Sequence, residues 1–254
     1  MKKEFIKDIV DLHSHVLPGI DDGAKSMEES LAMLRAAESQ GITLMACTPH
    51  LVLDKMHRQY CSKAYSRYKE LSAASKKEGI GIRLIFGFEL MLDESIYTCR
   101  RLYDYTIDNT RLLLMETPPD WRAETLFDAV EWLILKGFIP VLAHPERLGH
   151  LFGLFNFDHF KKLKRLNGQG LMLQINASGI TGFSGVATKL RAAHFITGGM
   201  YFIIGSDAHS PTGRLTEMQG ALHIIEKLKG HDKAVEAACT TPLRLLSKES
   251  PVIT

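Results

Sequence analysis

The sequence predicts an α/β protein with a parallel sheet. Short apolar runs alternate with helical patterns along the whole chain, and about seven of these runs have the length of a strand. No low-complexity linker or internal repeat interrupts the pattern, so we expect a single domain over residues 1–254. This length also suits a closed α/β barrel, which typically needs about 250 residues.

The predicted elements follow in order along the chain. After the first strand, a helix begins at a capping box formed by Ser26 and Glu29, and Gly41 ends it. The predicted strands cover residues 9–12, 44–47, 82–88, 112–115, 139–143, 171–175 and 201–204. The other predicted helices cover residues 62–77, 124–136, 157–166, 187–195, 215–228 and 232–246.

The composition restricts the class of protein. The 31 basic and 29 acidic residues give a formal charge of +2, which lacks the basic excess usual in nucleic-acid-binding proteins. The N-terminus has no signal-peptide pattern, and no segment approaches the ~20 apolar residues that cross a bilayer. None of the four cysteines forms a C-x-x-C pair. We expect a cytoplasmic protein with free thiols and without nucleic-acid partners or membrane insertion.

Histidine and carboxylate side chains gather where the predicted strands end. In parallel α/β folds, the carboxyl ends of the strands carry the catalytic residues. His13 and His15 are two residues apart, so on a strand both imidazoles face the same side and can reach one metal ion. Asp207 and His209 repeat this spacing after the last strand, which a barrel would place beside the first.

Nine residues form the predicted set of metal ligands. A tetrahedral zinc ion needs only about four ligands, so nine residues with carboxylates that can bridge imply two or three ions. Mixed imidazole and carboxylate ligands suit Mn²⁺, Fe²⁺ or Zn²⁺. Each residue alone also fits an ordinary structural role, and their shared position predicts the site. The nine are His13, His15, Asp22, His50, Glu89, Glu116, His144, Asp207 and His209.

Two arginines complete the predicted site. Arg147 and Arg214 each follow a ligand segment by a few residues. A guanidinium group can bind two phosphate oxygens at once, so we expect both side chains to bind phosphate. A surface salt bridge is the alternative interpretation of each.

These motifs resemble the polymerase-and-histidinol-phosphatase (PHP) superfamily of metal-dependent phosphoesterases. Within it the chain is similar to the bacterial capsule and exopolysaccharide tyrosine phosphatases, the CpsB/YwqE group. The resemblance covers nearly the whole chain, and two motifs, at residues 21–23 and 144–147, distinguish this group from more distant members. Its other specific segments are residues 11–15, 46–50 and 206–209.

The resemblance implies a distorted seven-stranded (β/α) barrel and a three-metal site. It assigns metal ligation to all nine residues, phosphate contacts to Arg147 and Arg214, and Mn²⁺ as the favoured ion. The implied activity is hydrolysis of a phosphotyrosine tail on a bacterial tyrosine kinase of capsule or exopolysaccharide synthesis. A hydroxide that bridges two metal ions would attack phosphorus, and His209 or a metal-bound water could protonate the leaving group.

Other functions stay open at this point. A small-molecule phosphatase of the histidinol-phosphate kind, a nuclease-like phosphodiesterase and a non-catalytic metal-binding module all fit the ligand set. The segment from Cys61 to Arg67 matches the C-x5-R signature of cysteine-dependent phosphatases, but it lacks glycine and looks helical, so we interpret the match as chance. The basic and aromatic stretch from Lys55 to Lys69 forms either a solvated helix face or a docking surface for an acidic, tyrosine-rich peptide.

Overall fold

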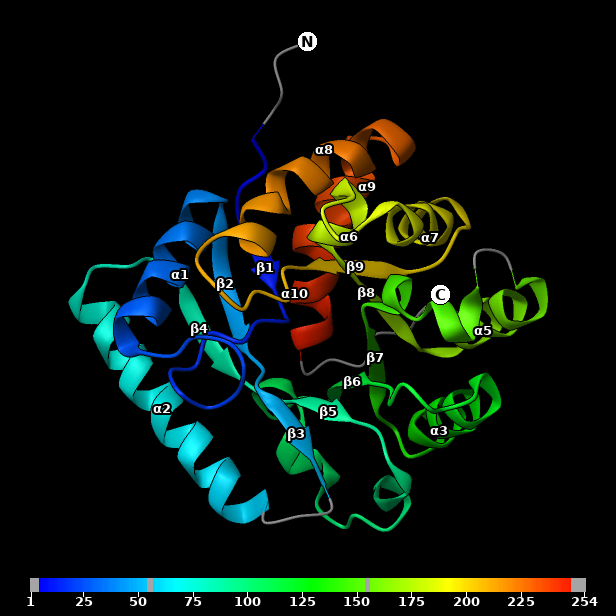
Figure 1. Ribbon diagram of the computed structural model, residues 1–254, viewed down its shortest axis with the longest axis horizontal. Coiled ribbons are helices and arrows are strands. Elements are labelled where there is room, and N and C mark those ends of the chain that lie inside the picture. The colour runs from blue at the N-terminus through cyan, green and yellow to red at the C-terminus, as the bar shows by residue number, and fades with distance from the viewer. Residues whose placement is uncertain (1–4, 54–56, 154–155, 248–254) are drawn as a thin grey trace.

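The computed structural model describes residues 5–53, 57–153 and 156–247. Their strands form two parallel sheets surrounded by helices (Figure 1). The first sheet contains, in spatial order, β1 (Ile9–Asp11), β2 (Ile42–Cys47) and β4 (Arg83–Phe86). The second contains β3 (His50–Val52), β5 (Glu89–Met91), β6 (Leu112–Glu116), β7 (Ile139–Ala143), β8 (Met172–Asn176) and β9 (Phe202–Gly205).

The α/β class and the parallel order of the strands are confirmed. The predicted strand over residues 82–88 is divided, because the chain breaks at Gly87 and resumes pairing in β5. A Cβ atom at Gly87 would lie 2.9 Å from Cα of Ile107, so the packing there has no room for a side chain. Strand β3 was not predicted, since a three-residue strand gives almost no periodic signal.

The first and last strands approach each other beyond their ends. Ser14 and Ala208 form an isolated parallel bridge between the segments that follow β1 and β9. The His15 amide donates to the Ala208 carbonyl at 2.9 Å, and the Asp207 amide donates to the His13 carbonyl at 2.9 Å. The two H-x-H-like segments at the ends of the chain therefore lie side by side.

Helices connect most of the strands. Ser26 caps α1 as predicted, since its hydroxyl accepts from the Glu29 amide at 3.3 Å, while the Glu29 carboxylate reaches the Lys25 amide instead of that of Ser26. Between β5 and β6 the chain forms only the short 3-10 helices η1 (Glu94–Tyr97), η2 (Leu102–Tyr105) and η3 (Ile107–Asn109). The α-helices are α1 (Met27–Ser39), α2 (His57–Lys77), α3 (Ala123–Leu135), α4 (Gly149–Phe152), α5 (Phe157–Gln169), α6 (Ala177–Thr181), α7 (Val186–Thr197), α8 (Met218–Lys229), α9 (His231–Val235) and α10 (Thr241–Leu246). Shorter turns are η4 (Pro145–Arg147), η5 (Gly213–Glu217) and a π-helical turn, η6 (Glu236–Thr240), which interrupts the predicted helix over residues 232–246.

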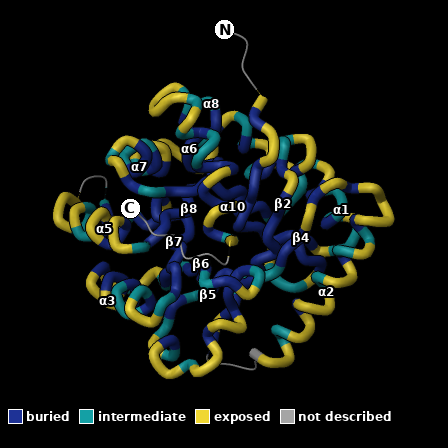
Figure 2. Tube along the Cα trace, turned by 180° about the vertical axis from the view of Figure 1, so that it is seen from behind, coloured by how far each residue is buried: buried dark blue, intermediate teal, exposed yellow. Residues whose placement is uncertain are grey.

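Both faces of the strands are buried, as a parallel sheet with helical connections requires (Figure 2). Leu112 and Leu114 of β6 pack into one apolar cluster, whereas the alternate residues Leu113 and Met115 pack into a second one. Leu245 of α10 belongs to the first cluster, so the last helix helps to fill it. Within the described residues, no helix has the length and apolar character needed to cross a bilayer.

Candidate metal centre

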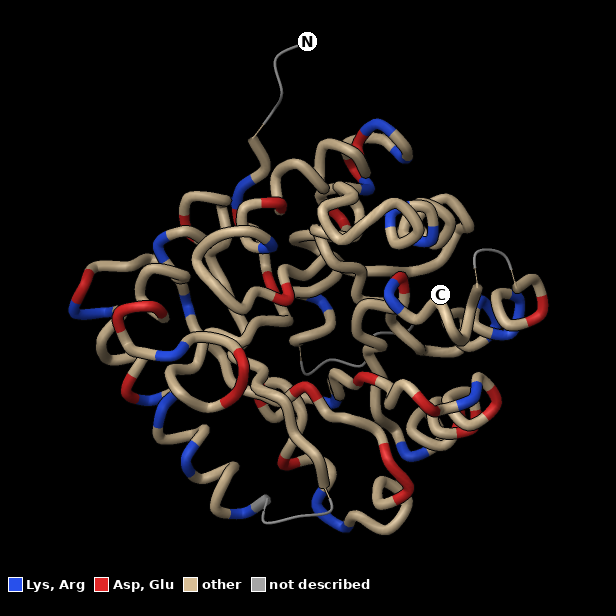
Figure 3. The backbone as a smooth tube through the Cα atoms, in the orientation of Figure 1, with Lys and Arg blue, Asp and Glu red and all other residues tan. Residues whose placement is uncertain are grey.

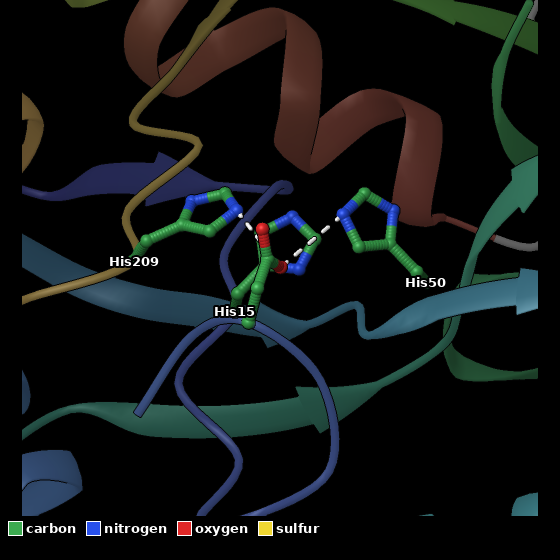
Figure 4. Close-up of side chains that lie close together, drawn as sticks. His15, His50 and His209 are labelled. Carbon is green, nitrogen blue, oxygen red and sulfur yellow. Dashed lines mark ion pairs between the residues drawn. The ribbon is translucent and has the colours of Figure 1, made fainter. Parts of the chain in front are cut away.

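The structure places the nine predicted ligands together at the carboxyl ends of the strands. Three overlapping groups of these side chains have ligand atoms within 4.8 Å of one another. Figure 4 shows His50, from β3, and His209, from the segment after β9, on either side of His15. The groups are His15 with Asp22, His50 and His209; His13 with His15 and Glu89; and His50 with Glu89 and Glu116. The remaining two residues adjoin them, with His144 Nε2 3.1 Å from Glu89 and Asp207 Oδ1 3.5 Å from His13.

A chain of hydrogen bonds fixes the orientation of His13. Asp207 Oδ2 can only accept, so the Asn176 amide donates its N–H to it, at 2.8 Å. The Asn176 oxygen then accepts from Gln174 Nε2 at 2.8 Å, and the Gln174 oxygen accepts from His13 Nδ1 at 2.7 Å. Because His13 donates through Nδ1, its Nε2 carries a lone pair that faces the site.

His15 is oriented in the same manner by Asp21. The Asp21 carboxylate accepts from His15 Nδ1 at 2.8 Å and also from the amides of Gly23 and His50. The imidazole therefore presents Nε2 to the site. Carboxylates that hold a ligand histidine from behind are a regular feature of metal centres and raise the basicity of the ligand. Of the two adjacent acids, Asp21 is this supporting residue, whereas the largely exposed Asp22 faces His50 and His209 at 3.5 and 3.3 Å.

The arrangement of these atoms fits a bound cation. Nε2 of His13 and Nε2 of His15 lie 3.2 Å apart, and in the neutral tautomers set by Gln174 and Asp21 their lone pairs face each other. Two lone pairs repel at this distance unless positive charge lies between them. Two ligand atoms bound to one ion at about 2.1 Å stand roughly 3.0–3.4 Å apart, which matches the observed spacing.

The side chains of His50, Glu89 and Glu116 form a second part of the site that also fits a bound cation. His50 Nδ1 lies 3.0 Å from Glu89 Oε2 and 2.9 Å from Glu116 Oε1. All three atoms are buried and none has a hydrogen-bond partner, and His144 Nδ1 is likewise unpartnered. A buried polar atom without a partner costs about 1–3 kcal/mol, so this set of close, unpartnered nitrogen and oxygen atoms fits a site that holds a cation.

The electrostatics of the site favour positive charge. Burial lowers the pKa of His15, but hydrogen bonds to Asp207, Asp21 and Glu89 raise it well above its usual value. Burial raises the pKa of Asp207, but the charges of His13 and its neighbours lower it far more. Without a metal ion the carboxylates therefore stabilise the protonated form of His15, whereas the neutral tautomers of His13 and His15 would apply with a cation bound. Divalent cations compete for the same negative charge and the same nitrogen atoms.

The two predicted phosphate-binding arginines converge on Asp207. Nη1 of Arg214 donates to Asp207 Oδ2 at 2.7 Å, and Nη1 of Arg147 donates to the same oxygen at 3.1 Å. Asp207 thus turns Oδ1 towards His13 and His15 and Oδ2 towards the arginines and Asn176. The Arg147 and Arg214 side chains stay partly exposed, so further N–H groups of both are available for a ligand beside the metal-binding atoms.

The backbone is strained at two of the predicted ligands. His144 has φ 34° and Asp207 has φ 49°, and non-glycine residues rarely adopt this left-handed region. His144 directly follows β7, and Asp207 lies two residues after the end of β9. At both places the chain must turn sharply to direct the side chain at the centre. Such strain is concentrated at functional sites and persists because surrounding contacts hold it.

Sequence reasoning missed the supporting residues of the centre. Gln174 and Asn176 lie on β8, which contributes no predicted ligand, and both are completely or almost completely buried. Their signal in the sequence is the alternation of two amides with apolar residues in a strand that is otherwise apolar. Asp21 was recognised only as a member of a motif. Its role depends on the loop conformation, which the sequence does not specify.

The C-x5-R segment is not a phosphate-binding loop. Cys61 and Arg67 both lie within α2, where the backbone amides are used inside the helix and cannot surround a phosphate. Burial raises the pKa of the Cys61 thiol to about 11, whereas nucleophilic cysteines have a lowered pKa. Lys55, at the start of the basic and aromatic stretch, lies outside the described residues.

Comparisons with known proteins agree with this geometry. The chain is 30% identical over 248 residues to the putative tyrosine-protein phosphatase CapC of Staphylococcus aureus. This match covers 95% of this chain and 92% of that protein. It is also 30% identical over 230 residues to the tyrosine-protein phosphatase YwqE of Bacillus subtilis, covering 88% and 86%.

Solved structures give the same result. A structure described as YwqE from Bacillus subtilis and CpsB from Streptococcus pneumoniae, unique metal-dependent tyrosine phosphatases, superimposes with a TM-score of 0.77 at 27% identity over 94% of both chains. A histidinol phosphate phosphatase from Lactococcus lactis shares the fold, with a TM-score of 0.55 at 14% identity over 89% of this chain and 95% of that one. The model of the family described as capsular polysaccharide synthesis, CpsB/CapC, matches residues 9–247. The chain therefore belongs to the CpsB/CapC family of capsular polysaccharide synthesis proteins.

Proposed function

We propose that this protein is a metal-dependent protein-tyrosine phosphatase. The observation that carries the proposal is the junction at Asp207, whose two oxygens face the imidazoles of the ligand groups on one side and two arginines on the other. The metal-binding atoms and the guanidinium groups thus contact the same side chain. A phosphate ester could therefore bind next to the metal ions and to the positive charges that stabilise its transition state. The curated relatives with 30% identity are tyrosine phosphatases by name.

The nine predicted residues hold the metal ions in this proposal. The three overlapping ligand groups support two or three divalent ions, with Mn²⁺ as the favoured metal. Divalent ions in such a site supply a water that is activated at neutral pH and positive charge next to the phosphoryl oxygens. Gln174 and Asp21 keep Nε2 of His13 and His15 directed at the ions, and therefore act as positioning residues.

Arg147 and Arg214 bind the transferring phosphoryl group. Their contacts with Asp207 hold the guanidinium groups in place before substrate arrives, so little rearrangement is needed as charge grows on the phosphoryl oxygens. His209 keeps Nδ1 on the Asp207 carbonyl at 2.9 Å and turns Nε2 towards the site. That Nε2 atom serves as a metal ligand or as the proton donor to the leaving phenolate.

We also propose that residues 1–254 form one domain whose strands close into a distorted seven-stranded barrel. In this interpretation β2 with β3, and β4 with β5, each form one bent strand, because only two residues separate the members of each pair. The bridge between Ser14 and Ala208 supports contact between the first and last strands. Closure would explain why ligands from both ends of the sequence share one site.

The proposed substrate is a phosphotyrosine segment of a bacterial tyrosine kinase in capsule or exopolysaccharide synthesis. The family and the names of the relatives support this choice. A phenolate leaving group, with a pKa of about 10, also departs more readily than an alkoxide.

A substrate panel tests the proposed activity. Turnover with Mn²⁺ should be compared for a phosphotyrosine peptide, the matching phosphoserine peptide and histidinol phosphate. We expect kcat/KM to be highest for the phosphotyrosine peptide by at least an order of magnitude. A preference for histidinol phosphate would instead assign the protein to the small-molecule phosphatases that share its fold.

A further inference from the structure

A large cavity lies outside the metal centre, between α2 and the connection from β5 to β6. Its volume is about 1010 Å³, at the upper end of the range of about 300–1,000 Å³ usual for ligand pockets. Both of its walls lie in the lower half of Figure 1. The cavity arises because the short helices η1, η2 and η3 replace a long α-helix at this place and leave the space beside α2 unfilled.

Aromatic rings form a continuous wall of this cavity. The ring centroid of Phe86 lies 5.5 Å from that of Tyr65, 5.3 Å from that of Tyr68 and 5.0 Å from that of Phe88. Phe88 in turn lies 6.0 Å from Tyr105 across the cavity wall. Tyr65 remains 49% exposed, so part of its surface is open to a ligand. Such a wall suits a flat aromatic group.

Arginine side chains line the same cavity. Arg101 pairs with Asp104 at 2.5 Å, but Arg58 and Arg100 have no ion-pair partner within the described part of the chain. Both are exposed, so they can reach an anion that enters from solvent. In Figure 3 further basic positions recur along α2. The acid Asp108 also lines the cavity and lies 3.9 Å from Arg83, at the start of β4.

The cavity and the metal centre lie back to back. Phe88 lines the cavity and the next residue, Glu89, lies in the metal centre, so only the thickness of the chain at β5 separates the two. Along the chain, Arg58 follows His50, a residue of the proposed metal centre, by only eight positions. The adjacency of Phe88 and Glu89 brings the cavity within reach of a substrate segment held at the metal centre.

We propose that this cavity is an accessory binding site for an aromatic group that carries a phosphate. The rings of Tyr65 and Phe86 contact the aromatic group, and Arg58 and Arg100 pair with the phosphate. The proposal rests on the proposed phosphatase function, since it makes the ligand a second phosphotyrosine of the same substrate segment. A nucleotide has the same chemistry and is the other source that the experiment distinguishes.

The test compares two peptides that differ only in phosphorylation. One carries a single phosphotyrosine and the other carries two, spaced along an extended segment. Exposed charge pairs contribute up to about fivefold each in binding, so we expect the native protein to show a KM about fivefold lower for the doubly phosphorylated peptide. The double variant Arg58→Ala/Arg100→Ala should lose this advantage, and Tyr65→Ala should reduce it.

The control is Arg67→Ala on the same helix. Arg67 is exposed and pairs with Glu70 at 2.6 Å, but it does not line the cavity, so this variant should retain the advantage. Equal KM values for both peptides in the native protein, or an advantage that survives the double variant, would overturn a phosphotyrosine ligand.

Calorimetric titration with ADP forms the second arm. One outcome is that ADP binds to the native protein and to Arg67→Ala but not to the double variant, while the second phosphotyrosine gives no lower KM. That result would keep the accessory site and assign it to a nucleotide. Absence of both effects, in a protein that hydrolyses the singly phosphorylated peptide, would overturn the accessory site alone. Failure to hydrolyse either peptide would instead overturn the proposed function.

Discussion

At the scale of single residues, Asp207 connects the proposed metal ligands to the two arginines proposed to bind phosphate. Its Oδ2 atom accepts from Asn176, Arg147 and Arg214, while Oδ1 faces His13 and His15. The conformation of both arginines therefore depends on the same carboxylate that supports the metal ligands. The arginines are not metal ligands in the proposed function, so substituting an arginine and substituting a ligand should have different effects on metal content.

Removing either arginine should reduce catalysis while the metal remains bound. Arg147→Ala or Arg214→Ala should lower kcat by about 10²–10³, because a charge-assisted contact to the phosphoryl oxygens is lost. Arg→Lys should restore only part of the rate, since lysine keeps the charge but not the two-point contact. Steady-state kinetics with elemental analysis measure both effects. His13→Ala is the contrasting variant and should lower metal content and rate together. Near-native turnover in both arginine variants would disprove the phosphate contact.

Asp21 should control metal affinity without being a ligand. Asp21→Asn removes the charge behind His15 and should weaken metal binding by about 10–100-fold, the usual effect of losing such a partner. Competition with a chromophoric chelator measures the affinity. Asp158→Asn, at an exposed position of α5, is the matched control and should bind metal as the native protein does. An unchanged affinity in Asp21→Asn would remove Asp21 from the centre.

The sequence predicts which histidines and carboxylates gather in one place, but not the residues that hold them in position. The spacing of His13 and His15 predicts the shared face because strand geometry alone determines it. The roles of Asp21 and Gln174 depend on which loop and which strand lie behind each imidazole. Gln174 lies 161 positions after His13, and the contact of Asp21 with His15 depends on how the loop folds, so no local pattern indicates either role.

At the scale of elements, strand β8 supports the centre without supplying a ligand. Gln174 fits beside β9 only because residue 205 is glycine, since a Cβ atom there would lie 2.6 Å from Gln174 Nε2. The helices and most strands could be predicted from their periodicity. The division at Gly87 and the 3-10 connection could not, because contacts with Ile107 and short turns determine them.

Two glycine substitutions separate this supporting role from ordinary packing. Gly205→Ala should displace Gln174, release His13 and lower metal affinity about tenfold or more. Gly168→Ala, at an exposed position of α5 with no atom within 4 Å of the added Cβ, should instead stabilise the protein by about 0.5–1 kcal/mol. Metal titration and chemical denaturation measure the two effects. Normal metal affinity in Gly205→Ala would show that β8 does not position His13.

Helix α2 should keep Cys61 unreactive at neutral pH. Burial raises its pKa from 9.0 to about 11, so at pH 7–8 the thiolate fraction is about a hundredfold smaller than for an unshifted thiol. Alkylation of Cys61 by iodoacetamide should be correspondingly slow and should accelerate about tenfold per pH unit up to about pH 11. Mass spectrometry of the Cys61 peptide measures the rate. Rapid alkylation at pH 7, together with loss of turnover in Cys61→Ser, would revive a cysteine nucleophile.

At the scale of the whole molecule, the parallel order of the strands collects residues from both ends of the chain in one centre. His13 and Asp207 are 194 positions apart, yet the Asp207 amide donates to the His13 carbonyl at 2.9 Å. Every later step of the proposed function depends on cations bound at this meeting point. Hydrolysis of phosphotyrosine should therefore require these ions.

The most direct test is a metal titration of the chelated protein. Phosphotyrosine-peptide turnover should be followed as Mn²⁺ is added, with the bound metal determined by elemental analysis in the same samples. Turnover should disappear on chelation and return in proportion to the occupied sites, saturating at two or three ions per chain. Full turnover by a protein that elemental analysis shows to be free of metal would contradict it.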